Sequence, residues 1–386
     1  MSGISEESNI FAVNIIRMKR MKTYNEVKGM LALLCIILLC GSCSSRVQED
    51  LVMLVGTYTD GSSKGIYSYR FNQLTGKATP LDTLETRNPS YLTISDDSRL
   101  VYAVSETNDE KASLNVIGLN KDGNMMLLNT ALTEGADPCY VAENGQIAVT
   151  ANYSGGSMSV FDIDGSKATL TDKFLGETGG PDLSRQNTPH VHCSCLTPDG
   201  AYVLATDFSA DRILSYRIEG KKLAACGVAA KVSADSGPRH LVFSRDGRFA
   251  YLMSELSGKV TAFRYDKGRL ETLQEIVSDS VGGRGGADIH LSPDGRFLYS
   301  SNRLKAEGLA IFSVDNKTGL LTRIGYQPTG SHPRQFNITP NGRFLLCCCR
   351  DSDKIQVFRR DMQTGMLTDT HQDIPVSKAV CVQFGR

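Results

Sequence analysis

The segment "SPDGRFLYSSNR", Ser292–Arg303, contains a tight-turn motif followed directly by an apolar run. Asp and Gly favour the turn, and the aromatic and aliphatic residues after it are typical of a β-strand. Similar segments recur about every 48 residues, a period that indicates a repeat architecture. The copies begin at Ser95, Glu143, Thr197, Ser244, Ser292 and Thr339.

A second alternating strand and a second turn follow each copy, as in "RILSYRIEGKKL", Arg212–Leu223. One further copy of this second half, "GIYSYRFNQLTGKA", Gly65–Ala78, lies ahead of the first complete repeat. Its missing first strand is supplied in our interpretation by "KAVCVQF", Lys378–Phe384. The two ends of the repeat region are therefore expected to share one repeat.

Each repeat contains four strands, which is typical of a four-stranded antiparallel blade, and blades of this length stack radially. We predict an all-β, seven-bladed β-propeller, closed by N- and C-terminal strands in one blade and occupying residues 51–386. A two-sheet sandwich is the alternative, but it does not explain the sevenfold period. No segment with helical periodicity interrupts the pattern after Leu51.

Residues 1–50 form a separate N-terminal extension. The apolar run from Met30 to Leu39 follows basic residues, is too short to span a membrane and precedes small residues. This pattern predicts a signal peptide, and "CGSC" resembles a lipoprotein signal with Cys43 as the lipidated residue. We therefore expect a periplasmic or outer-membrane-attached lipoprotein whose only membrane contact is this lipid anchor. An uncleaved hydrophobic anchor, or a cytoplasmic protein if the leader is misread, is the alternative.

The overall charge argues against nucleic acid as a partner. Lys plus Arg and Asp plus Glu both number 42, and no long basic run supplies a local field. The consecutive cysteines Cys347, Cys348 and Cys349 lie in a strand-like run, where neighbouring side chains point in opposite directions and bridge poorly. We expect no disulfide framework.

The stretch "NTPHVHCSC", Asn187–Cys195, raises the question of a metal site. In an extended strand His190 and His192 share one face, whereas Cys193 and Cys195 share the other. A single His2Cys2 site cannot form within such a strand, and no second cluster has zinc-ligand spacing. We expect no metal and no cofactor, with the cysteines packed as small core residues.

The glycine-rich segment "GGRGGADIH", Gly282–His290, lacks the Lys-Ser/Thr of a phosphate-binding loop and precedes a strand rather than a helix. We interpret it as a flexible link between blades.

Register predicts where polar side chains meet. The first strand of each blade lines the central channel and the second returns to the same rim, so residues that begin the first strand and follow the second should lie together. Aligned on the turns, the first-strand column contains Ser90, Cys139, His192, Arg239, Ala287 and Arg334. The second-strand column contains Glu106, Tyr153, Phe208, Glu255, Arg303 and Arg350.

These columns place four arginines, a histidine and two glutamates at one end of the ring, with His240 and Asp288 in the adjacent column. Salt bridges that join neighbouring blades would be a purely structural explanation. The excess of cations favours an anionic ligand, because the planar arginine fork binds two oxygens of a phosphate or carboxylate.

Four segments carry a resemblance to a known family: "SGPRHLVFSRDGRFAYLMSELSG", "ADIHLSPDGRFLYSSNR", "HPRQFNITPNGRFLL" and "PHVHCSCLTPDGAYVLATDFSADRI". They resemble the lactonase family of seven-bladed propellers, which includes bacterial cycloisomerase-2-type 6-phosphogluconolactonases and fungal carboxy-muconate lactonizing enzymes. The resemblance covers Leu51–Phe384. It implies that His192, Arg239, Glu255 and Arg303 are active-site residues.

For lactone hydrolysis, a base must activate water and cations must stabilise the oxyanion. His192 or Glu255 is the expected base, and Arg239 is expected to stabilise the oxyanion. The expected substrate-binding residues are His240, Arg334, Glu106, His190 and Arg350, with Arg303 helping to place the phosphate or carboxylate.

The expected function is hydrolysis of 6-phospho-D-glucono-1,5-lactone, a small-molecule partner. An exported location conflicts with that substrate, because sugar phosphates are scarce outside the cytoplasm. Two alternatives remain open. One is an exported enzyme acting on another acidic lactone, such as a muconate-type cycloisomerase. The other is a non-catalytic propeller that binds an acidic sugar or a protein.

Overall fold

The computed structural model describes residue 14 and residues 17–23 and 50–385. Contacts divide the chain into two units, residues 1–48 and 49–386. In the first unit residues 17–23 are helical, and the predicted apolar run and lipidation site at Cys43 lie outside the described residues. Among the described residues no helix is both long and apolar enough to cross a membrane.

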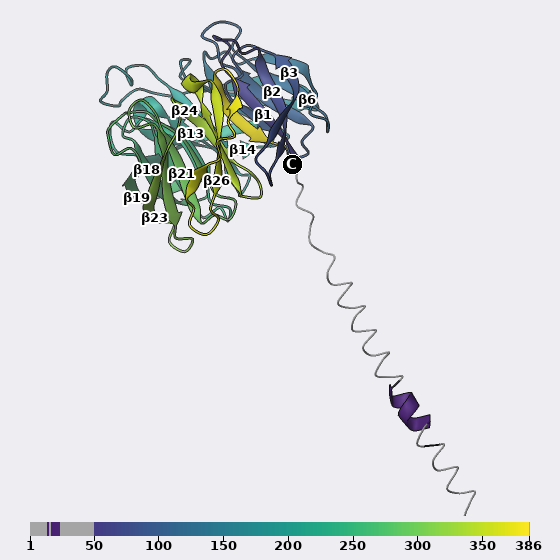
Figure 1. The fold of residues 1–386 in the computed structure, drawn as a ribbon. Helices are drawn as coiled ribbons and strands as arrows, with labels where there is room; N and C mark the ends of the chain where they lie inside the picture. Colours follow the sequence, from purple (N-terminus) through teal and green to yellow (C-terminus); the bar gives the residue numbers. More distant parts are fainter. Residues whose placement is uncertain (1–13, 15–16, 24–49, 386) are drawn as a thin grey trace, which may run out of the picture. The chain divides into compact units, whose positions relative to one another are not determined.

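The second unit consists of seven antiparallel sheets (Figure 1), which we number as blades 1 to 7. Blade 1 contains β4 (Leu92–Ile94), β5 (Leu100–Ser105), β6 (Ser113–Leu119) and β7 (Met125–Leu132); blade 2 contains β8 (Pro138–Glu143), β9 (Ile147–Asn152), β10 (Ser157–Asp164) and β11 (Lys167–Leu175); blade 3 contains β12 (Val191–Leu196), β13 (Tyr202–Asp207), β14 (Arg212–Glu219) and β15 (Lys222–Lys231). Blade 4 contains β16 (Pro238–Phe243), β17 (Phe249–Ser254), β18 (Lys259–Asp266) and β19 (Arg269–Val277); blade 5 contains β20 (Gly286–Leu291), β21 (Phe297–Asn302), β22 (Gly308–Val314) and β23 (Leu321–Pro328). Blade 6 contains β24 (Pro333–Ile338), β25 (Phe344–Cys349), β26 (Lys354–Arg360), β27 (Leu367–Asp369) and the short β28 (Ile374–Pro375); blade 7 contains β29 (Ala379–Phe384), β1 (Asp50–Thr57), β2 (Gly65–Asn72) and β3 (Ala78–Glu85).

The first strands of the blades form a closed ring. They contact one another in the order β4, β8, β12, β16, β20, β24 and β29, and β29 returns to β4. In blade 7 the C-terminal β29 pairs antiparallel with β1, and the yellow strand lies beside the purple one in Figure 1. The seven-bladed propeller and its predicted closure are therefore confirmed. Two 3-10 turns, η1 (Phe208–Ala210) and η2 (Arg350–Ser352), follow the second strands of blades 3 and 6.

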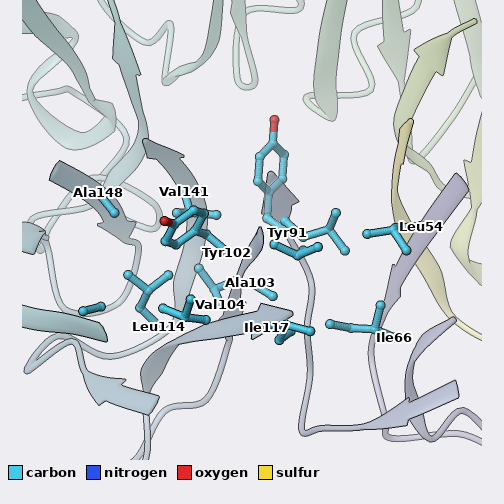
Figure 2. Close-up of a cluster of buried hydrophobic side chains, with 14 of the residues drawn as sticks. Leu54, Ile66, Tyr91, Tyr102, Ala103, Val104, Leu114, Ile117, Val141 and Ala148 are labelled. Atoms are coloured by element: carbon cyan, nitrogen blue, oxygen red, sulfur yellow. The ribbon is translucent and has the colours of Figure 1, made fainter. Parts of the chain in front are cut away.

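Apolar cores lie between adjacent blades. In the cluster shown in Figure 2, Leu54 and Ile66 of blade 7 pack with Ile117 of blade 1, and Val141 and Ala148 of blade 2 join them. Strand residues alternate between the two faces of a sheet, so each blade contributes side chains to both neighbouring cores. Six clusters of buried apolar side chains join the sheets of the described ring, so its stability comes from the boundaries between blades rather than from one central core. Each fully buried aliphatic side chain in them contributes about 1.5–3 kcal/mol.

The repeated turn has a defined hydrogen-bond pattern. Asp246 accepts a bond from the hydroxyl of Ser244 at 2.7 Å and from the backbone N–H of Arg248 at 3.1 Å. Gly247 follows with a φ of 71°, a left-handed conformation that glycine adopts without strain. The Ser-x-Asp-Gly pattern is therefore dictated by the hairpin that joins the first two strands.

Candidate active site

A β-bulge occurs in most of the first strands at the residue that the turn alignment placed in the first-strand column. The strand register shifts there by one residue, and the extra residue is left outside the ladder. This displacement re-aims the side chain, so polar residues can occupy the channel end of strands that are otherwise apolar. The bulged residues in blades 2, 3, 4 and 6 are Cys139, His192, Arg239 and Arg334.

The second-strand column lies at the same end of the ring. The backbone N–H of Glu255 donates to the carbonyl of Gly237 at 2.8 Å, and that of Arg303 donates to Gly285 at 2.9 Å. Both acceptors come shortly before the first strand of the same blade. The two columns therefore meet at one end of the ring, which we call the mouth.

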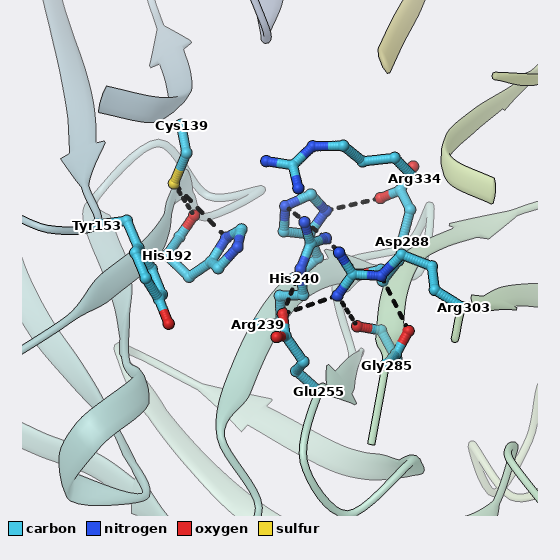
Figure 3. Close-up of polar contacts among 12 residues, drawn as sticks. Cys139, Tyr153, His192, Arg239, His240, Glu255, Gly285, Asp288, Arg303 and Arg334 are labelled. Atoms are coloured by element: carbon cyan, nitrogen blue, oxygen red, sulfur yellow. Dashed lines mark hydrogen bonds and ion pairs between the residues drawn. The ribbon is translucent and has the colours of Figure 1, made fainter. Parts of the chain in front are cut away.

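Glu255 lies at the centre of an ion cluster at the mouth (Figure 3). Its Oε2 contacts Nε of Arg239 at 3.0 Å and Nη2 of Arg303 at 2.9 Å, while its Oε1 accepts from Nη2 of Arg185 at 2.6 Å. Burial alone would raise the pKa of Glu255, but the three guanidinium groups outweigh it and lower the pKa to about 2. Glu255 is therefore a fixed anion and a weak base at neutral pH.

The donors of two arginines are largely occupied by protein acceptors. Arg239 donates through Nη1 to the carbonyl of Ala287 at 2.6 Å. Arg303 donates through Nε to Gly285 at 3.0 Å and through Nη2 to Gly286 at 3.1 Å. Burial lowers the pKa of Arg303 to about 10, but it stays protonated at neutral pH. Among the described residues, Nη2 of Arg239 has no protein partner and remains available.

His192 is buried, and its ring orientation depends on Cys139. The thiol of Cys139 donates to the backbone carbonyl of His192 at 3.4 Å, and its sulfur lies 3.7 Å from the His192 Nδ1. A thiol has one proton; when that proton is on the carbonyl of His192, the sulfur can accept from Nδ1–H, and the lone pair of the imidazole is then at Nε2. Burial and the nearby Arg239 keep the pKa of His192 well below its usual value. His192 is therefore neutral, and its Nε2 makes no hydrogen bond to another described residue, although its ring packs edge-on against Tyr153 and His240.

His240 lies next to Arg239 and is paired with Asp288. Its Nδ1 donates to Asp288 at 2.7 Å, and its Nε2 accepts from Arg239 at 3.3 Å. The second oxygen of Asp288 contacts His290 at 2.9 Å. Burial and Arg239 lower the pKa of His240 to about 4 in spite of the carboxylate. Both ring nitrogens of His240 therefore have protein partners, and we assign His240 the role of holding Arg239 in position.

Arg334 extends from blade 6 across the mouth, and Figure 3 shows its guanidinium and the imidazole of His192 facing the same space. Its Nη2 lies 3.7 Å from Glu106, and its guanidinium lies 5.2 Å from the ring centre of Tyr58. The hydroxyl of Tyr58 donates to Glu106 at 2.8 Å. The Arg334 guanidinium makes no hydrogen bond to a described residue, and its ion pair with Glu106 is 3.7 Å long, which leaves its donors available to a ligand.

Two of the predicted site residues have other partners. His190 stacks on Tyr153 at 4.2 Å, and its Nδ1 contacts the Tyr153 carbonyl at 2.8 Å. Arg350 makes a two-pronged contact with Asp351 at 2.8 and 2.9 Å. The strand that follows His190 starts at Val191, so the simple alternation expected for this stretch does not hold: His190 precedes the strand and His192 is displaced by the bulge.

The structure adds Arg185, Tyr58 and His332 to the site. Arg185 lies in a segment outside the blade pattern, and only the longer interval from Glu143 to Thr197, 54 residues against 48 for the preceding repeat, marks it in the sequence. Tyr58 is the second-strand residue of blade 7, which has no turn of its own to align. His332 accepts from Nη1 of Arg303 at 3.5 Å, and burial lowers its pKa to about 3.

The described residues contain no group of three or more His, Cys, Asp or Glu side chains arranged to hold a metal ion. The eight cysteines of residues 50–385 are free thiols, and all but Cys226 are buried.

A seven-bladed ring with a neutral histidine and several arginines gathered at one mouth has the organisation of a propeller enzyme. The family description that matches residues 52–384 is "Lactonase, 7-bladed beta-propeller". The chain belongs to this lactonase family, and it is a lactonase-type enzyme, an ester hydrolase that opens cyclic esters.

Two relatives in sequence are named 6-phosphogluconolactonase. The protein of Formosa agariphila is 34% identical, and the alignment covers 86% of this chain and 99% of the relative. The protein of Bacillus subtilis is 31% identical over 86% and 97% of the two chains.

Two crystal structures share the fold. A candidate 6-phosphogluconolactonase of Bacteroides uniformis is 56% identical, with a TM-score of 0.86 and coverage of 88% of this chain and 100% of that one. The periplasmic gluconolactonase of Pseudomonas aeruginosa is 34% identical, with a TM-score of 0.82 and coverage of 87% and 99%.

Proposed function

We propose that this protein hydrolyses a sugar lactone with an anionic group, and that its substrate is 6-phospho-D-glucono-1,5-lactone. The observation that carries the proposal is the pairing of one neutral histidine, His192, with arginine donors that protein groups do not use. The names of the two sequence relatives support the substrate class. Three arginines around the single carboxylate of Glu255 leave an excess of positive charge that favours an anion.

In the proposed reaction, Nε2 of His192 accepts a proton from a water molecule, and the water oxygen attacks the lactone carbonyl carbon. Negative charge develops on the carbonyl oxygen, and the free donors of Arg239 and Arg334 stabilise it. The ring C–O bond then breaks, and His192 returns the proton to the leaving oxygen. The products are a carboxylic acid and a hydroxyl on the same open chain.

Glu255 has a different role in this scheme. Its pKa of about 2 makes it a poor proton acceptor at neutral pH. We assign it the task of holding Arg239 in position, with Arg303 fixing the carboxylate from the neighbouring blade. Of the two bases considered from the sequence, His192 is therefore the one that we propose.

A second candidate substrate is unphosphorylated glucono-1,5-lactone. The predicted lipoprotein leader and the likeness to a periplasmic gluconolactonase favour it, because sugar phosphates are scarce outside the cytoplasm. We propose an exported, lipid-anchored location through Cys43, which radiolabelled palmitate incorporation with a Cys43→Ala control would test.

The experiment compares hydrolysis of both freshly prepared lactones by the purified full-length protein with hydrolysis by the His192→Ala and Glu255→Gln variants. We expect turnover above the spontaneous rate and a preference for the phosphorylated lactone. The His192→Ala variant should lose about 100-fold or more in kcat, as expected for a general base.

Other outcomes separate the alternatives. A preference for the unphosphorylated lactone would select the second substrate. Ring closure of a muconate-type diacid, tested in the same panel, would identify a cycloisomerase. Turnover no faster than in buffer, with a bound sugar acid detected by calorimetry, would identify a binding propeller.

A further inference from the structure

Residues 176–190, which we call segment 176–190, join blade 2 to blade 3 and place Arg185 at the mouth. The segment is fixed to blade 3 through Gln186, which is only 1% exposed. The amide Nε2 of Gln186 donates to the carbonyl of Phe208 and to Oδ1 of Asp211, both at 3.0 Å. The backbone N–H of Gly180 donates to the carbonyl of Ser209 at 2.7 Å.

A second attachment comes from the glycine-rich link ahead of blade 5. Arg284 in that link contacts Asp182 at 2.6 Å and makes a two-pronged contact with Asp235 at 2.7 Å. The backbone N–H groups of Arg185 and Gln186 donate to the carbonyl of Asp182 at 3.0 and 2.7 Å. The link that we interpreted as flexible is therefore held by ion pairs, and it fixes the turn that carries Arg185.

The side chain of Arg185 differs from those of the other mouth arginines. It is 37% exposed, whereas the side chains of Arg239 and Arg303 are 2% and 7% exposed. Its hydrogen bonds, with Glu255 at 2.6 Å and the hydroxyl of Tyr153 at 3.4 Å, both use Nη2. Nε and Nη1 have no hydrogen-bond partner among the described residues, and the guanidinium lies 5.6 Å from the ring centre of Phe208.

We propose that Arg185 selects for the anionic terminus of the substrate: the two N–H groups of Nη1 bind the 6-phosphate of the lactone while Nη2 remains on Glu255. This inference rests on the proposed function. Of the Arg185 donors only Nη2 contacts Glu255, so the guanidinium can bridge the carboxylate and a phosphate without moving. Hydrogen bonds between a guanidinium and a phosphate are charge-assisted and strong.

The shape of the substrate supports this assignment. In the lactone ring the phosphate-bearing C6 is attached to C5, which the ring oxygen joins to the carbonyl carbon, so the phosphate lies outside the ring and within reach of a residue beside the carbonyl site. His192 is buried and the side chain of Arg334 is 15% exposed, and these two residues would take the carbonyl, which leaves the solvent side for the phosphate. Arg185 fits that side better than Arg350, because Arg350 is held by a two-pronged contact with Asp351, and its Nη2 also contacts His332.

The test uses the full-length protein with Arg185→Gln, Arg185→Lys and, as a matched control, Arg217→Gln. Arg217 is exposed on β14 and pairs only with Glu219. We would measure kcat and KM for the phosphorylated and unphosphorylated lactones, and calorimetric binding of 6-phosphogluconate and gluconate. For Arg185→Gln we expect KM for the phosphorylated lactone and the dissociation constant of 6-phosphogluconate to rise about tenfold more than those of the unphosphorylated ligands, which change only through the lost contact with Glu255.

Arg185→Lys should lie between the wild type and Arg185→Gln, since it keeps the charge but replaces the planar guanidinium, which reaches both Glu255 and the phosphate, by a single ammonium group. Equal losses on both substrates would overturn the inference and reduce Arg185 to a residue that positions Glu255. Unchanged binding of 6-phosphogluconate would also overturn it. If the wild-type protein hydrolyses neither lactone, the proposed function fails. Calorimetry would still test the inference, because Arg185→Gln should weaken the binding of 6-phosphogluconate more than that of gluconate.

A separate experiment tests whether the contact between Asp182 and Arg284 holds segment 176–190 in place. Asp182→Asn weakens the contact with Arg284, so trypsin should cleave after Arg185 faster than in the wild type and KM should rise for the phosphorylated lactone alone. If cleavage is faster and both substrates are affected equally, the inference fails.

Discussion

Glu255 of blade 4 and Arg303 of blade 5 form a buried ion pair of 2.9 Å that crosses the boundary between two blades. The same carboxylate holds Arg239 of its own blade and Arg185 of segment 176–190. One buried anion therefore connects three parts of the chain. The sequence left two interpretations of these charged residues open: salt bridges between blades, or a site for an anionic ligand. The cluster around Glu255 joins two blades and is also part of the site that we propose.

Removing this anion should destabilise the protein. Glu255→Gln leaves buried guanidinium groups without a counter-charge, and we expect a loss of about 3–5 kcal/mol in the free energy of unfolding. Denaturant unfolding measures the loss. Glu271→Gln is the control, since Glu271 is 65% exposed in its pair with Arg264, and it should cost less than about 1 kcal/mol. Equal effects of the two substitutions would contradict the structure of the cluster.

Cys139 should control the tautomer of His192. In Cys139→Ala the acceptor of the Nδ1 proton is lost, so the proton can move to Nε2 and remove the base. We expect kcat to fall about tenfold with KM within about twofold, while Cys139→Ser keeps an acceptor and recovers most of the rate. Steady-state kinetics measure both, and the exposed Cys226→Ala is the control. A Cys139→Ala enzyme with wild-type kcat would show that the thiol does not set the tautomer.

Stability should fall as the pH is lowered below neutrality. His240 has a pKa of about 4 in the folded protein against 6.5 in the unfolded chain. The unfolded state therefore binds more protons between these values, so the contribution is complete above pH 6.5 and is lost as the pH falls to 4. The loss is about 3 kcal/mol for this residue.

His192 and His332 act in the same direction, and the contribution of Glu255 is lost only further down, between pH 4.5 and about 2. Urea unfolding of the wild type and of His240→Asn from pH 7 to pH 4 measures the slope. The variant should lose less stability over this range; an unchanged slope would mean that His240 is not held neutral.

The sequence predicted the ring and much of the mouth because both depend on a repeating register. The turn motif around Asp246 recurs, so counting from it places His192, Arg239, Glu255 and Arg303 at one end without any knowledge of contacts. The bulges preserve this count, since each displaces a residue at the same distance from the turn.

The remainder depends on features that have no period. Arg185 comes from a segment that follows no blade pattern, and Tyr58 belongs to the blade assembled from both ends. The sequence also could not predict which arginine N–H groups are already bonded within the protein. The donors of Arg303 are occupied because the carbonyls of Gly285 and Gly286 point toward them, and a sequence pattern does not give the direction of a carbonyl.

The pairing of β29 with β1 also has a consequence for the order of events during synthesis. β1 is made first among the strands of the ring, yet its edge partner follows every other strand in the chain. The nascent propeller must therefore keep an open edge while the other six blades emerge from the ribosome, and unpaired edges invite aggregation. Blade 7 can be completed, and the ring closed, only after β29 has been synthesised.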